Sequence, residues 1–174
     1  MTLEHKDALD VYGRCVPGVW RYDLLFSDFT AAAQTETLTL NPLIATGASM
    51  SGGGAIITDA FVLIEAQFAS PNVVRIVCDV GDATNGSDAY LDAVEIHAAG
   101  HGSVGLKGDT PNEKGDRLVG ATASDSGGTM FLDENVAITV TVDTSASGAD
   151  NVDDMTAGQL TICIVYYEIP QRLE

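Results

Sequence analysis

The feature that most constrains the fold is the C-terminal run from Gly158 to Ile169, which Pro170 follows. The run is short and rich in β-branched and aromatic residues, with Gly before it and Pro after it, as is typical of a strand and not of a helix. Because apolar residues occupy consecutive positions, the pattern predicts a strand that is buried on both faces. We therefore expect an all-β domain built around this strand.

Earlier segments show the two-residue period of half-buried strands. From Val19 to Phe26, the apolar side chains Trp20, Tyr22, Leu24 and Phe26 alternate with polar ones. Further strands are expected at Thr35–Leu40, Ile56–Phe68, Val73–Val80, Thr129–Leu132 and Val136–Val142. In Val73–Val80 the alternation places Val74, Ile76, Cys78 and Val80 inside, and in Val136–Val142 it places Val136, Ile138, Val140 and Val142 on one face.

Two predictions concern how these segments connect. Ile56–Phe68 and Val73–Val80 are expected to pair as a hairpin across the turn Ala69–Asn72. Residues 81–120 are rich in Gly, Asp, Asn and His, and we expect them to form a loop-rich face. Within them, Asp88–Ala98 has a weak helical pattern.

About seven or eight strands separated by Gly, Pro and Asn turns indicate an antiparallel β-sandwich or jelly roll. A chain of 174 residues is most simply one domain. Residues 1–18 lack a clear period and end in a Val-Pro-Gly turn signal. We therefore expect an N-terminal arm over residues 1–18 and a β-sandwich domain over residues 19–170.

The net charge and the number of cysteines limit the classes of protein to which this chain can belong. The formal net charge is −17, with no basic cluster, which disfavours nucleic-acid binding. No apolar run approaches the ~20 residues of a membrane helix, and the first residues lack a signal-peptide pattern. The chain has three cysteines, Cys15, Cys78 and Cys163, an odd number that cannot all pair within one chain. We therefore expect them to be inert reduced thiols in a protein made in the cytoplasm.

Motifs for metal binding do not reach a full ligand set. His97 and His101 are four residues apart, but glycines flank His101 and no third ligand is evident. Asp79, Asp82 and Asp88 partly match a calcium loop, but their spacing fits no ordered ligand pattern. A solvated turn is the preferred interpretation of these aspartates.

Motifs for catalysis are also incomplete. In Gly100–Lys107, Leu106 stands where a phosphate-binding loop requires Lys, and neither Ser nor Thr follows Lys107. Neither Ser49 nor Ser103 completes a Gly-x-Ser-x-Gly nucleophile motif. We therefore expect no enzyme activity, no cofactor, and no catalytic, cofactor-binding or metal-binding residues.

Two segments resemble small structural proteins of tailed bacteriophages. Val80–Leu91 reads Val-Gly-Asp-Ala-Thr-Asn-Gly-Ser-Asp-Ala-Tyr-Leu, which is similar to their Val-Gly-Asp-x-Thr loop leading to Asp/Gly-Tyr-Leu. Asp153–Thr161 contains Met-Thr-Ala-Gly, which is similar to their turn into a final strand. The order of features matches over about Thr35 to Ile169.

This resemblance implies a β-sandwich virion protein of the capsid decoration (cement) class, bound as a homotrimer on the outside of the head. The implied partner is the major capsid protein of a phage head, with no nucleic acid and no membrane. The implied location is the capsid exterior, after synthesis in the host cytoplasm. The acidic composition agrees with an outer position, because packaged DNA repels an acidic protein.

Two other function classes remain open. A tail or fibre-associated β-sandwich module could bind a host-surface glycan, but it would need aromatic residues in loops. Between the expected strands of the sandwich domain, only Phe29 and Tyr90 are aromatic. A hydrolase is the other class, and it lacks a nucleophile or metal motif.

Overall fold

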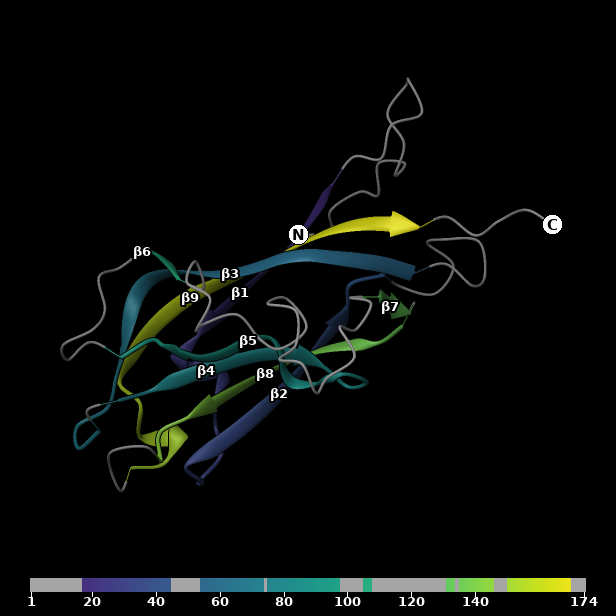
Figure 1. Cartoon of the computed structure of the whole chain (residues 1–174). Helices are drawn as coiled ribbons and strands as arrows, with labels where there is room; N and C mark the ends of the chain where they lie inside the picture. The colour runs from purple at the N-terminus through teal and green to yellow at the C-terminus, as the bar shows by residue number, and fades with distance from the viewer. Residues whose placement is uncertain are drawn as a thin grey trace, which may run out of the picture.

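Two antiparallel sheets lie face to face in the computed structural model of the chain (Figure 1). The structure describes residues 17–44, 54–73, 75–97, 105–107, 131–133, 135–145 and 150–169. This architecture confirms the predicted all-β sandwich. The 3₁₀ helices within these described ranges are η1 (Phe26–Asp28) and η3 (Val152–Asp154).

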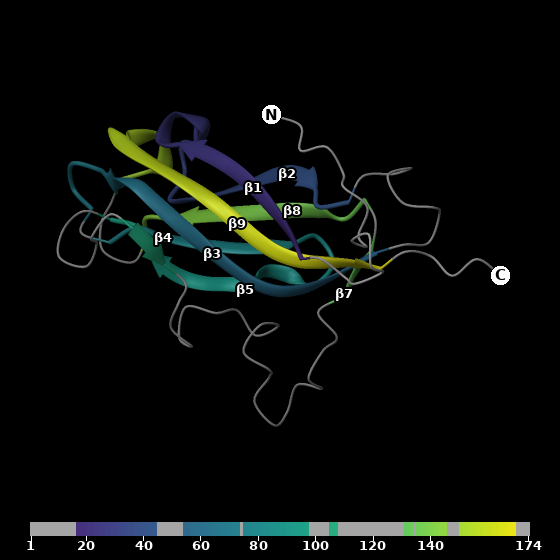
Figure 2. The same ribbon diagram turned by 90° about the horizontal axis from the view of Figure 1, so that it is seen from above.

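The first sheet has the strand order β1-β9-β3-β6, and a fifth strand, β7, also pairs with β3. Its strands are β1 (Gly18–Leu25), β3 (Gly54–Ala69), β6 (Gly105–Lys107), β7 (Phe131–Asp133) and β9 (Ala157–Ile169). The second sheet has the order β2-β8-β4-β5. Its strands are β2 (Thr35–Pro42), β4 (Val77–Asp82), β5 (Gly86–Glu95) and β8 (Ala137–Asp143). Seen from above, β1 and β2 lie along the same side of the sandwich (Figure 2).

Strand β9 is the expected central strand, paired with β1 on one side and β3 on the other. Its inward row of Leu160, Ile162 and Ile164 is fully buried. The prediction that both faces are buried is wrong for most of the outward row, because Cys163 and Val165 are only half-buried. In a two-layer sandwich, only one face of each sheet lies against the core.

The core fills the space between the two sheets. The alternation that the sequence predicted in Val136–Val142 is confirmed: Ile138, Val140 and Val142 are fully buried and Val136 packs against them. Their partners across the sandwich are the inward rows of β3 and β9. The fully buried side chains of these and neighbouring strands include Ile57, Val62, Ile64, Ile76, Cys78, Val80, Leu91, Val94, Leu160, Ile162 and Ile164.

The predicted hairpin between Ile56–Phe68 and Val73–Val80 is wrong. Strand β3 pairs with β6, β7 and β9, whereas β4 pairs with β5 and β8 in the other sheet. The chain therefore crosses between the sheets after β3. Two-residue alternation shows which side chains face inward, but it does not show which strand lies alongside.

The predicted helical segment Asp88–Ala98 is also wrong, because β5 occupies Gly86–Glu95. Its pairing with β4 shifts register twice, and Ala93 has a φ of 49°. These irregularities leave Tyr90, Leu91 and Val94 all buried, a spacing that resembles one face of a helix.

Some predicted boundaries fall partly outside the described residues. Most of the expected arm, residues 1–16, lies outside them, and Gly18 is the first residue of β1. Val74 and residues 129–130 also lie outside. The strand expected from Val73 begins at Val77, and the one expected near residue 129 is β7.

Gly158, the second residue of β9, is required by both the backbone conformation and the packing. Its φ is +147°, which L side chains rarely adopt. A Cβ at this position would lie 2.4 Å from the Phe68 ring. The Met-Thr-Ala-Gly turn that the sequence singled out therefore depends on this glycine for the close approach of β9 to β3.

Replacing Ile164 tests the central position of β9. Ile164→Ala should lower the free energy of unfolding by ~2 to 5 kcal/mol, because it removes a fully buried aliphatic side chain. Val165→Ala, one residue along on the half-buried outer face, is the matched control and should cost clearly less. Urea unfolding followed by tryptophan fluorescence gives both values, and equal losses would contradict the assigned inward face.

Candidate functional site

The candidate site is the outer face of the sheet formed by β1, β9 and β3. Strand register positions its residues: Asp23 of β1 and Leu63 of β3 both lie opposite Thr161 of β9. One step along, Arg21 lies opposite Cys163. Because the inward rows of these strands are filled with core residues, the alternate residues form a continuous outer surface.

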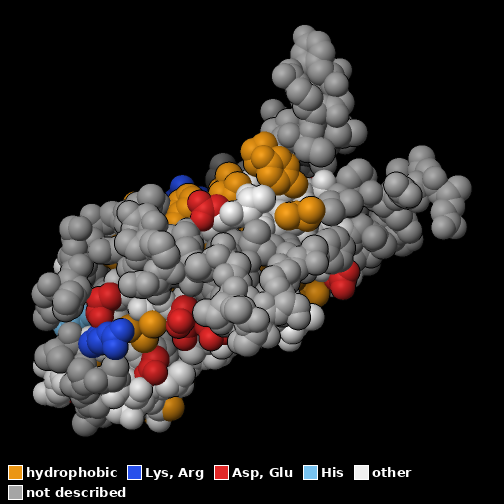
Figure 3. All heavy atoms as spheres, in the orientation of Figure 1, with side chains coloured by type: hydrophobic (Ala, Val, Ile, Leu, Met, Phe, Trp, Pro, Cys, Tyr) orange, Lys and Arg blue, Asp and Glu red, His pale blue; other side chains and the backbone are white. Residues whose placement is uncertain are grey.

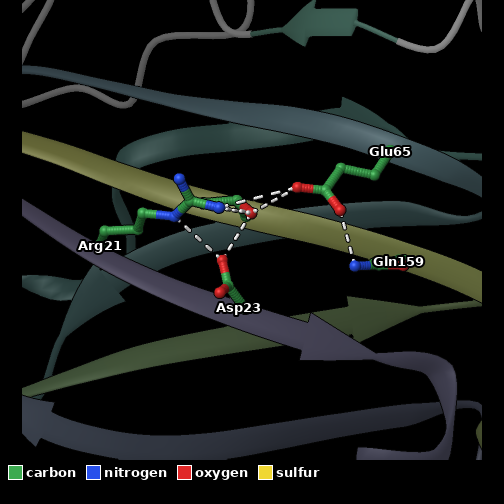
Figure 4. Close-up of polar contacts among 5 residues, drawn as sticks. Arg21, Asp23, Glu65 and Gln159 are labelled. Carbon is green, nitrogen blue, oxygen red and sulfur yellow. Dashed lines mark hydrogen bonds and ion pairs between the residues drawn. The ribbon is translucent and has the colours of Figure 1, made fainter. Parts of the chain in front are cut away.

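A polar network occupies the middle of this face (Figure 4). Arg21 Nε donates to Asp23 Oδ1 at 3.1 Å, and Arg21 Nη2 donates to the Thr161 hydroxyl at 3.3 Å. The same hydroxyl donates to Asp23 Oδ1 at 2.6 Å, with Glu65 Oε1 as a second acceptor at 3.2 Å. Gln159 Nε2 donates to the other Glu65 oxygen at 2.6 Å. Three strands are thus tied together by side chains as well as by backbone.

The network shifts the pKa values of its charged groups. The hydrogen bond from Thr161, followed by those from Arg21, holds the pKa of Asp23 below its usual value. The hydrogen bond to Asp23 and its charge raise the pKa of Arg21. Arg21 Nη2 also lies 3.7 Å from Glu65 Oε1. Both ends of the Arg21–Asp23 pair are more than half exposed, so solvent screens the attraction between them.

Apolar side chains flank the network. Val19 is 49% exposed, Leu25 is 47% exposed and Leu63 is 37% exposed. Phe61 and Val165 lie half-buried in the same outward rows. Figure 3 shows hydrophobic side chains next to one another along the upper margin of the molecule, where Figure 1 draws this sheet. A surface that combines exposed apolar groups with oriented charges is suited to contact with another protein.

The Asp82 cluster forms a closed turn and not an open cation loop. Asp82 is 1% exposed and accepts the backbone N–H groups of Thr84 and Asn85 at 2.7 and 2.8 Å. It also accepts the Asn85 side-chain amide and the buried Tyr90 hydroxyl. The sequence predicted a solvated turn, whereas the Asp82 carboxylate within this turn is buried.

Asp79 stands apart from that turn. It accepts the backbone N–H of Ala93 at 2.7 Å. Burial, followed by repulsion from Asp92, Asp88 and Asp143, raises its pKa. Among the residues that the structure describes, no group of three His, Cys, Asp or Glu side chains is arranged to hold a metal ion.

The histidine and serine motifs lie partly or wholly outside the described residues. His97 is 5% exposed and its backbone bridges to Phe68. His101, Ser49 and Ser103 lie outside the described residues, as does most of Gly100–Lys107. Of the two histidines and two serines in these motifs, the structure therefore places only His97.

The described cysteines are separated. Cys78 lies in the core, where burial raises the pKa of its thiol strongly. Cys163 lies half-buried on the outer face, and burial again raises its pKa. Both are unpaired thiols. Raised pKa values leave little of the reactive thiolate at neutral pH.

One buried network was missed by sequence reasoning. The Asp150 carboxylate accepts the Ser70 hydroxyl at 2.5 Å, and the backbone and side-chain N–H groups of Asn72 at 2.8 and 2.9 Å. These hydrogen bonds lower the pKa of Asp150. The network ties the segment after β3 to the one before η3. The only signal in the sequence was a turn-rich composition at both places, which does not show that they meet.

No helix among the described residues has both the length and the apolar character needed to cross a membrane. Comparisons of the chain with protein-family models, with curated proteins and with solved structures gave no match.

Thr161→Val tests the electrostatic role of the network. Asp23 has a depressed pKa, so its contribution to stability is present above its unfolded pKa and is lost as pH falls through the folded pKa. Removing the Thr161 hydroxyl should raise the Asp23 pKa, as followed by ¹³C NMR of its carboxyl carbon. Thr37→Val, which removes a threonine hydroxyl from the other sheet, should leave the Asp23 pKa unchanged. An unaltered pKa in Thr161→Val would contradict the assignment.

Proposed function

We propose that the protein is a non-enzymatic structural protein of a phage virion, a decoration (cement) protein that binds as a homotrimer to the outside of the head and stabilises it. Its partner would be the major capsid protein. The observation that carries the proposal is the outer face of the β1–β9–β3 sheet, which presents Val19, Leu25 and Leu63 to solvent around the Arg21–Asp23 pair. That face has the composition of a contact surface.

The two sequence motifs that resemble phage structural proteins have clear structural roles. In the Val-Gly-Asp-x-Thr segment, Asp82 organises the β4–β5 turn through its bonds to Thr84 and Asn85. In the Met-Thr-Ala-Gly segment, Gly158 allows β9 to pass close to Phe68. The motifs support the proposal as determinants of the sandwich fold.

The acidic charge supports an outer position on a head. The chain carries 25 Asp and Glu residues against 8 Lys and Arg residues. Such a protein is repelled by packaged DNA, whereas exposure to solvent imposes no penalty. A neighbouring capsid protein would then be bound mainly through apolar contact, with Arg21 available for an acidic partner group.

The alternative of a glycan-binding tail or fibre module has less support. The two aromatic residues that were expected in loops are buried: Phe29 is 2% exposed and Tyr90 is 1% exposed. Carbohydrate rings stack on exposed aromatic faces, which neither residue provides.

Particles test the proposal directly. Phage particles purified from lysates that produce this protein should contain it in many copies, and a cryo-EM reconstruction should show trimers outside the shell. Stripped heads incubated with the purified protein should rebind it. Recovery of the protein only from the soluble fraction, or only at the tail, would contradict the proposal.

Variants of the outer face identify the contact. Leu63→Asp should reduce rebinding to stripped heads, because it places a charge in the apolar surface. Thr35→Asp adds the same charge at an exposed position of the other sheet and serves as the control. Both variants should melt near the wild-type temperature, and equal binding by both would rule out the β1–β9–β3 face as the capsid contact.

A further inference from the structure

We infer that β1 is a self-complementary edge through which two copies of this chain pair antiparallel, with the two-fold axis at Tyr22. The inference concerns contact between copies. It shares Val19, Arg21 and Leu25 with the proposed capsid contact, but its test requires no capsid protein. It rests on the position of β1 in its sheet, on the order of its side chains and on their exposure.

The outer edge of β1 has no strand partner within the described part of the chain. Among the described residues β1 pairs with β9 alone, and it is the end strand of its sheet (Figure 2). Its eight residues pair with β9 in continuous register from Gly18 to Leu25, without a bulge. Natural proteins commonly protect an edge with a bulge, a proline or charged side chains, especially lysine. Between Gly18 and Leu25, β1 has no bulge, proline or lysine, and its charged side chains are Arg21 and Asp23.

The two faces of the sheet restrict the possible registers. Residues directly opposite each other point to the same face, and the inward row of Trp20, Tyr22 and Leu24 must stay on the core side. A slip of one residue would bring the outward Arg21 or Asp23 onto the core side of the joined sheet. Only registers that pair outward residues with outward residues remain.

One of these registers is complementary at each outward position. With Tyr22 opposite Tyr22 of the second copy, Arg21 lies opposite Asp23 and Asp23 lies opposite Arg21. At the two ends, Val19 lies opposite Leu25, so the two most exposed apolar side chains of the strand cover one another. The pairing thus joins opposite charges in the centre and apolar groups at both ends.

The two neighbouring registers of the β1–β1 pairing bring like charges together. Shifting the pairing by one allowed step in one direction places Arg21 opposite Arg21, and in the other direction it places Asp23 opposite Asp23. Like charges directly opposite on adjacent strands are destabilising. The charges of β1 therefore favour this register over its two neighbours, as well as favouring association.

The inward row also gains from the pairing. Trp20 and Tyr22 stack with ring centroids 5.7 Å apart, and both are only half-buried at the margin of the core. In the paired register Trp20 lies opposite Leu24 of the second copy, and the two Tyr22 rings adjoin. The two cores would then become continuous across the edge.

Charge exchange provides the test. Arg21→Asp gives a strand with two acidic groups, and Asp23→Arg gives one with two basic groups. Each variant alone should associate about tenfold or more weakly than the wild type in sedimentation velocity over a concentration series. An equimolar mixture of the two should restore association, because each Asp then faces an Arg of the other variant. The double variant R21D/D23R should also associate.

The matched control is Arg75→Asp, which makes the same charge change at an arginine that is about as exposed as Arg21 and is paired with Glu95. It should associate as the wild type does.

The β1 contact joins two copies of the oligomer that the chain otherwise forms, so that its mass doubles. A monomer gives a dimer, and a trimer gives a pair of trimers. Wild-type protein that shows no doubling, or a mixture that fails to associate, would overturn the inference. Restored association in the mixture also excludes misfolding as the cause of the single-variant losses.

Discussion

The structure depends on the double pairing of β9. This strand bonds to β1 along one side and to β3 along the other, so most of its backbone groups are satisfied within one sheet. Its inward row of Leu160, Ile162 and Ile164 is fully buried against the second sheet. The hydrophobic contribution of that row and the ladder hydrogen bonds therefore stabilise the same segment. Without β9, the edge strand β1 would have no partner among the described residues.

The surface chemistry follows from the same pairing. Register with β9 brings Asp23 and Thr161 together although they are far apart in the sequence, and it brings Glu65 to the same place from β3. The resulting network holds Arg21 and Asp23 in defined positions on the outer face. The apolar side chains around them stay exposed because the sandwich has only two layers. A surface of this kind suits the proposed role in a protein shell and the proposed pairing of β1.

The sequence allowed the strands to be predicted better than their partners. Period-two alternation correctly assigned the inward residues of β1 and β8, because one face of each strand lies on the core. The same alternation gave the wrong partner for β3, since pairing depends on where the chain crosses between sheets. In β5, the bulges and the positive φ of Ala93 disturb the two-residue alternation of a strand. The buried residues of β5 are therefore spaced like those on one face of a helix. The outer-face network could not be predicted, because Arg21, Glu65 and Thr161 meet only through register.

Native-state hydrogen exchange tests the central role of β9 most directly. Amides of residues 160–164 should exchange only through global unfolding, with a free energy of opening equal to that measured in urea. Outward amides of β1 should exchange faster in dilute solution and become protected as the concentration rises. Exchange of the β9 amides at the rate of the edge strand, with an opening free energy well below the global value, would contradict the account.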